Sequence, residues 1–129
     1  MGRTRKEYYM SNVIVLGASA KPERYANQAV RLLVKHGHTV IPVHPATQTI
    51  EGLPVVARLE DVNETVDTLT VYVGPDISTR MEQAIVNLHP SRVIFNPGTE
   101  NPKLATKLAA AGIHVETACT LVLLRTDQF

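Results

Sequence analysis

The sequence has 129 residues, of which 44% are hydrophobic and 19% are charged, as expected for one globular domain. Thirteen Lys and Arg against twelve Asp and Glu leave a formal net charge of +1, so no overall field recruits nucleic acid or a membrane surface. One cysteine excludes an internal disulfide, and no apolar run approaches the length of a membrane span. We expect a cytoplasmic protein without a nucleic-acid or membrane partner.

We expect residues 1–11 to form an N-terminal extension to the folded domain. The start of this extension is basic but lacks the apolar segment of a secretory signal. The folded domain is predicted over residues 12–129. Its first elements are a short apolar strand, an amphipathic helix ended by a glycine, and a second strand, at 13–17, 26–36 and 39–43. The stretch 44–64 is irregular, with one helical turn near Leu59.

The second half alternates in the same way. Strands, helices and one unassigned apolar stretch follow in chain order: strand 68–73, helix 77–88, strand 92–95, helix 102–111, strand 114–116 and the stretch 119–124. Strands that alternate with amphipathic helices form right-handed βαβ units. We therefore predict a Rossmann-like, three-layer α/β/α single domain with a five-stranded, mostly parallel sheet.

The fold class indicates where a ligand binds. In an open doubly wound sheet the ligand lies beyond the carboxyl ends of the strands, where the strand order reverses. If the five strands lie in the order 3-2-1-4-5, this crevice falls between the first and the fourth. The loops after those strands, 17–25 and 96–101, are the predicted site.

The first loop has the residues that a phosphate site needs. Gly17 permits a tight turn, and the small Ala18 and Ser19 let backbone amides and a hydroxyl approach an anion at a helix N-terminus. Lys21 and Arg24 can add charge-assisted hydrogen bonds. The alternative is a plain strand-to-helix turn with two solvated cations.

The dinucleotide fingerprint G-x-G-x-x-G is absent, because Ser19 stands where the second glycine belongs. An NAD site also needs an acidic residue after the second strand, and this chain has Val43-His44-Pro45 there. A histidine suits a ribose phosphate or an adenine edge better than a ribose diol. Alternatively, His44 is an ordinary surface histidine.

These motifs resemble the CoA-binding domain family, small relatives of the N-terminal domain of the succinyl-CoA synthetase α subunit. The resemblance runs from about Asn12 to the C-terminus and rests on Gly17-Ala18-Ser19 with Pro22 and Arg24, Val43-His44-Pro45, Asn96-Pro97-Gly98-Thr99-Glu100 and Ala118-Cys119-Thr120. It implies a Rossmann-like domain that binds coenzyme A, with the phosphates on the first loop and the adenosine near the end of the second strand. The family pattern more often reads Val-Asn-Pro at the second motif, so His44 is a departure.

From the loops and the resemblance together we predict a set of cofactor-binding residues: Gly17, Ala18, Ser19, Lys21, Pro22, Arg24, Tyr25, Val43, His44, Pro45, Asn96, Pro97 and Gly98. The predicted ligand is coenzyme A or an acyl-CoA, with NAD(P) as the alternative. No histidine pair has metal-ligand spacing, so no metal site is predicted.

Three functions remain open. The first is a non-catalytic coenzyme A-binding or regulatory module, and apolar helix faces could support a homodimer of it. The second is an enzyme, using NAD(P) redox chemistry or thiol and acyl chemistry at Cys119, although a lone cysteine between apolar residues is more often a small core residue. The third is an interaction domain that has lost its ligand, which the intact loop from Gly17 to Arg24 argues against.

Overall fold

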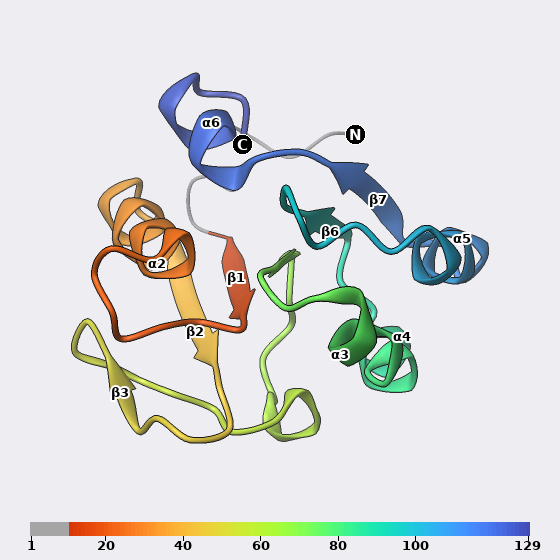
Figure 1. The fold of residues 1–129 in the computed structure, drawn as a ribbon, viewed down its shortest axis with the longest axis horizontal. Coiled ribbons are helices and arrows are strands. Elements are labelled where there is room, and N and C mark those ends of the chain that lie inside the picture. The colour runs from red at the N-terminus through yellow and green to blue at the C-terminus, as the bar shows by residue number, and fades with distance from the viewer. Residues whose placement is uncertain (1–10) are drawn as a thin grey trace.

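A parallel sheet with helices on both faces forms the described part of the molecule (Figure 1). The structure is a computed structural model that describes residues 11–129. Its five-stranded sheet has the order β2 (Thr39–Val43), β1 (Asn12–Leu16), β5 (Thr68–Val71), β6 (Arg92–Phe95) and β7 (His114–Thr117). Each neighbouring pair is parallel. The predicted N-terminal extension falls on residues 1–11, of which 1–10 lie outside the described residues.

The helices cover the sheet in two layers. α2 (Tyr25–Lys35) and α6 (Thr120–Arg125) pack on one face, and α4 (Glu82–Leu88) and α5 (Pro102–Ala110) pack on the other (Figure 1). Alternate residues of β1 point to opposite layers, since side chains alternate along a strand. Val13 and Val15 join the core under α2, whereas Ile14 and Leu16 join the core under α4 and α5. The predicted three-layer α/β/α domain is confirmed.

The strand order differs from the expected one. Numbered along the chain within the main sheet, the strands lie in the order 2-1-3-4-5, so the order 3-2-1-4-5 is wrong. The chain leaves β2, crosses back over β1 and adds β5 on the far side of β1. The order therefore reverses between β1 and β5, and a ligand crevice is expected there. The loop after β6 is one strand further away.

The sheet ends at β2, whose Pro42 occupies an edge position. Pro42 lies opposite Val15 of β1 in the register. Its carbonyl turns outward and accepts a hydrogen bond from the Val56 amide at 3.0 Å. The missing N–H of the proline faces the same outer side, so the ladder to β1 loses no donor.

Two predicted segments are more structured than expected. The stretch 44–64 contains a hairpin of β3 (Thr49–Ile50) and β4 (Leu53–Pro54), and the predicted turn near Leu59 is the 3₁₀ helix η1 (Leu59–Asp61). The turn of the hairpin is a two-residue turn, Glu51-Gly52, in which both residues have a positive φ. The unassigned stretch 119–124 is mostly α6, with Cys119 as its N-cap.

The predicted helix over 77–88 is two helices, α3 (Pro75–Thr79) and α4, with a break at Arg80 and Met81. The amide of Asn101, the N-cap of α5, donates to the hydroxyls of Ser78 and Thr79 at 2.9 Å. These bonds tie the end of α3 to the start of α5. The chain then begins a new helix from Met81, whose side chain packs against the core.

A polar cluster lies buried at the carboxyl ends of β5 and β6. The amide nitrogen of Asn96 donates to Thr70 Oγ1 at 2.7 Å and to the Val71 carbonyl at 2.8 Å, and its oxygen accepts from the Thr120 amide at 2.9 Å. The Thr70 and Thr120 hydroxyls are 2.7 Å apart. Asn96 is 2% exposed, and both donors and the oxygen of its side-chain amide are occupied by hydrogen bonds that join β5 and β6 to α6.

The ring of Tyr72, the residue after β5, packs against the core under α2. Burial raises the pKa of Tyr72 to about 12. Thr120 and Thr70 lie near enough to moderate this rise. Their hydroxyls are already bonded to each other, however, and within residues 11–129 the buried Tyr72 hydroxyl makes no hydrogen bond of its own.

Replacing Asn96 tests the buried cluster. In Asn96→Asp both donors are lost and a carboxylate faces the Val71 carbonyl, so we expect the free energy of unfolding to fall by about 2–4 kcal/mol. Urea denaturation measures this change. The exposed Asn87→Asp on α4 is the matched control and should change stability by no more than about 0.5 kcal/mol. Equal stability of the two variants would contradict the role given to Asn96.

The raised pKa of Tyr72 predicts that the protein loses stability at alkaline pH. Because the pKa of Tyr72 is raised in the folded protein, the neutral phenol contributes fully to the free energy of unfolding below pH 10, the ordinary pKa. This contribution is lost as the pH rises toward 12. Between pH 9 and pH 11 the wild type should lose about 1 kcal/mol relative to Tyr72→Phe. Urea unfolding of both proteins at the two pH values measures this. A stability difference that stays constant over the interval would contradict it.

Candidate functional site

The site begins where β1 and β5 end side by side. Gly17, the residue after β1, has φ +86°, and its amide donates to the Val43 carbonyl at 3.0 Å. A Cβ at this position would lie 2.7 Å from Cγ1 of Val73 and 3.1 Å from the Tyr72 backbone. The Tyr72 amide in turn donates to the Leu16 carbonyl at 2.8 Å. Glycine is required here both by the positive φ and by this close approach.

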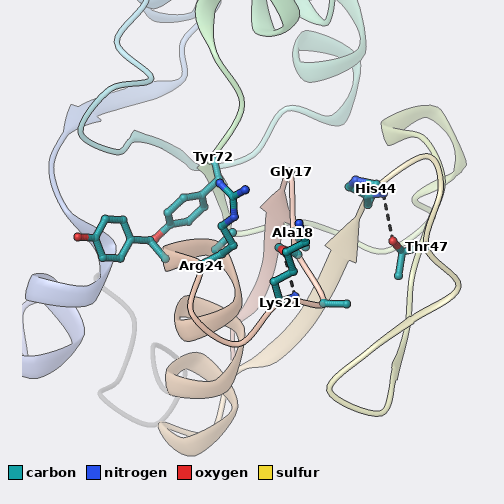
Figure 2. Close-up of a pocket in the computed structure, with 11 residues that line it drawn as sticks. Gly17, Ala18, Lys21, Arg24, His44, Thr47 and Tyr72 are labelled. Carbon is teal, nitrogen blue, oxygen red and sulfur yellow. Dashed lines mark hydrogen bonds between the residues drawn. The ribbon is translucent and has the colours of Figure 1, made fainter.

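An open cavity of about 540 Å³ lies at this point, a volume in the range of small-molecule sites. Three segments enclose it: the loop from β1 to α2, the residues after β2, and the residue after β5. Figure 2 shows side chains from these segments around the cavity. The lining residues are Gly17, Ala18, Ser19, Ala20, Lys21, Arg24, Tyr25, Ala26, His44, Thr47 and Tyr72.

The loop from β1 to α2 is held by its own hydrogen bonds. The Lys21 amide donates to Ser19 Oγ at 3.1 Å, and the Arg24 amide donates to the Lys21 carbonyl at 3.1 Å. Because Ser19 Oγ accepts in the first of these bonds, its own proton remains available to a ligand. The hydroxyl is therefore oriented as a donor without a ligand being present.

The start of α2 has no side-chain cap and no acidic residue in its own first turn. In the described part of the chain the backbone N–H groups of Ser19 and Ala20 donate to no protein acceptor. Free N–H groups and the positive end of the helix dipole attract negative charge. Lys21 and Arg24 are exposed, and neither forms a salt bridge with a described carboxylate.

His44 faces the cavity from the end of β2 (Figure 2). Its Nδ1 accepts a hydrogen bond from the Ala46 amide at 3.1 Å and lies 3.3 Å from Thr47 Oγ1. A nitrogen that accepts from a backbone amide carries no proton, so the neutral ring has its proton on Nε2. His44 therefore offers a donor to a ligand where a dinucleotide site would offer a carboxylate acceptor.

The structure brings together seven of the predicted site residues around the cavity: Gly17, Ala18, Ser19, Lys21, Arg24, Tyr25 and His44. Three others lie beside it: the Val43 carbonyl holds the loop, the Pro22 carbonyl accepts from Arg31, and Pro45 is exposed next to His44.

The remaining predicted residues, Asn96, Pro97 and Gly98, do not line this cavity, because the observed strand order moves their loop away from the point of reversal. Their contact with a ligand stays a prediction. Four lining residues were not in the predicted set: Ala20, Ala26, Thr47 and Tyr72. The strand order would have identified Tyr72, since it follows the strand next to β1.

Cys119, the candidate nucleophile, is half-buried at the N-cap of α6 and does not line the cavity. Among the described residues, no three His, Cys, Asp or Glu side chains gather where a metal ion could bind. No helix within residues 11–129 is long and apolar enough to cross a membrane.

Comparisons with known proteins agree with this geometry. A family model described as a CoA binding domain matches residues 11–125. The solved structure of an uncharacterized protein is 39% identical with a TM-score of 0.88, and the match covers 93% of this chain and 98% of that one. A Thermus thermophilus protein is 31% identical with a TM-score of 0.86, covering 95% of this chain and 92% of that one.

A larger protein contains the same fold. An acetyl-coenzyme A synthetase from Ca. Korarchaeum cryptofilum, in complex with phosphate and ADP, is 22% identical with a TM-score of 0.72. The match covers 84% of this chain and 25% of that one, and at this identity it shows the fold alone. The family match, by contrast, extends over nearly all of the described residues and includes every segment that encloses the cavity. The chain belongs to the CoA-binding domain family.

Proposed function

We propose that this protein binds coenzyme A, free or acylated, in the cavity between the ends of β1 and β5, and that it acts as a binding or regulatory module. One observation carries the proposal. Within residues 11–129, the lining includes an uncapped helix N-terminus with free N–H groups and two cations that form no salt bridge, Lys21 and Arg24. In a chain of net charge +1, this concentration of donors is a local feature.

The donors suit the anionic groups of coenzyme A. Its pyrophosphate would accept from the free amides of Ser19 and Ala20 and from the Ser19 hydroxyl. Lys21 and Arg24 would neutralise the phosphates, including the 3′-phosphate that distinguishes coenzyme A from most other adenine nucleotides. The Nε2–H of His44 would donate to the adenosine portion or its phosphate.

The lining argues against the NAD and enzyme alternatives. Among the described residues, those that enclose the cavity include no carboxylate, so the diol of an adenosine ribose would lack the acceptor typical of NAD sites. Cys119 is also absent from the lining, which favours binding over thiol chemistry. Contacts from Asn96, Pro97 and Gly98, a homodimer and a cytoplasmic location remain predictions from the sequence.

Calorimetric titration with coenzyme A, dephospho-CoA, NAD and ATP at fixed salt tests the proposal. We expect coenzyme A to bind and dephospho-CoA to bind more weakly, because the latter lacks one phosphate. Lys21→Ala and Arg24→Ala should each weaken coenzyme A binding by about tenfold or more, as expected for a charge-assisted hydrogen bond. Raising the salt concentration should weaken wild-type binding more than that of either variant.

Two matched controls remove the same charges outside the cavity. Lys103→Ala on α5 and Arg58→Ala before η1 alter exposed cations and should leave coenzyme A affinity unchanged. If NAD or ATP bound while coenzyme A did not, the assignment of coenzyme A would be overturned.

A further inference from the structure

Asn27 lies at the centre of a hydrogen-bond network behind the loop of the site. It belongs to the first turn of α2 and is 0% exposed. Its Nδ2 donates to the Ser19 carbonyl at 2.9 Å and to Oε2 of Glu51 at 3.1 Å. Its Oδ1 accepts from Nε of Arg31 at 2.8 Å, and Nη2 of Arg31 donates to the Pro22 carbonyl at 2.9 Å. The network therefore joins α2, the loop and the turn of the β3–β4 hairpin.

The orientation of the Asn27 amide is fixed by its charged neighbours. A carboxylate accepts only and a guanidinium donates only, so Glu51 must face the amide nitrogen and Arg31 must face the amide oxygen. A flipped amide would point its oxygen at both Glu51 and the Ser19 carbonyl. Glu51, Arg31 and the Ser19 carbonyl therefore all favour the same orientation, in which Asn27 presents a donor to the loop.

This donor determines how the loop faces a ligand. A trans peptide unit is planar, with its C=O and N–H pointing in opposite directions. Holding the Ser19 carbonyl toward Asn27 leaves the Ala20 N–H pointing away from Asn27, and Ala20 lines the cavity. Arg31 holds the Pro22 carbonyl, further along the loop, in a similar way. The Ser19 and Pro22 carbonyl oxygens, which would repel an anion, are thus held by Asn27 and Arg31.

The position of Glu51 is unfavourable for a glutamate. Its φ of +51° is one that Gly or Asn adopts more readily, and the neighbouring Gly52 also has a positive φ. The hairpin itself is anchored by Ile50, which is 1% exposed. What Glu51 adds is its carboxylate, which reaches across to Asn27.

We infer that Glu51 is a positioning residue for the anion-binding loop, acting through Asn27 from a hairpin that does not line the cavity. The inference rests on the proposed function for its ligand. Its structural part is that Glu51 orders residues 19–24, and this part concerns the free protein and needs no ligand. A positioning residue of this kind increases affinity by reducing the ordering that binding must otherwise pay for.

Glu51→Gly and Glu51→Gln separate positioning from simple electrostatics. A carboxylate near the first turn of α2 opposes a bound anion, so electrostatics alone predicts tighter coenzyme A binding in both variants. Positioning predicts weaker binding in Glu51→Gly, by about threefold to tenfold, the range of one hydrogen bond. Glu51→Gln keeps an acceptor for Asn27 and should bind at least as tightly as the wild type. Glu60→Gln, an exposed glutamate outside the cavity, is the control and should not change affinity.

Amide hydrogen exchange in the free protein supplies a readout that needs no ligand. The Lys21 and Arg24 amides are hydrogen-bonded within the loop, and both should exchange several-fold faster in Glu51→Gly but not in Glu51→Gln. The thermal midpoint of Glu51→Gly should not fall, because glycine relieves the positive φ.

The two readouts distinguish the two proposals. Wild-type protein that fails to bind coenzyme A would overturn the proposed function, whereas the exchange rates would still test the positioning. Unchanged exchange at Lys21 and Arg24 in Glu51→Gly would overturn the positioning role. Coenzyme A affinity in Glu51→Gly equal to or tighter than that of the wild type would overturn it as well.

Discussion

The close approach of Gly17 to the segment after β5 is the constraint on which the site depends. The chain leaves β1 so near this segment that a single methyl group would collide with the Val73 side chain and crowd the Tyr72 backbone. This contact sets the first turn of the loop, and the Val43 carbonyl holds the Gly17 and Ala18 amides from the other side. The loop thus starts from a fixed point between two strands. The later residues of the loop therefore follow a start that is held on both sides.

The fold was largely predictable because its signals are local. Short apolar runs such as 13–17 are typical of strands buried on both faces, and glycines such as Gly37 mark helix ends through their positive φ. The hairpin turn at Glu51-Gly52 was missed because its strands are two residues long, too short to show a period. The break before α4 was missed; the hydrogen bonds found next to it, from Asn101 to Ser78 and Thr79, join residues that are distant in sequence.

The site was predictable in part, for a related reason. Residue type and spacing alone predict an anion-binding loop at residues 17–24, and Gly17, Ser19, Lys21 and Arg24 do line one cavity. Tyr72 could not be placed without knowing which strand lies beside β1, and the strand order is a property of the whole chain. The role of Asn27 is harder still to read, since an asparagine in a helix has no distinguishing pattern. Its importance comes from a glutamate 24 positions away.

The edge of the sheet at β2 has a consequence for the behaviour of the protein in concentrated solution. A bare edge strand offers unpaired N–H and C=O groups to a strand of another molecule, which leads to aggregation. Here the outer side of β2 lacks a donor at Pro42, and its carbonyl is already bonded to Val56. The segment that returns from the hairpin thus shields this edge. The same stretch of chain that brings Glu51 to Asn27 also covers this edge of the sheet against pairing with another molecule.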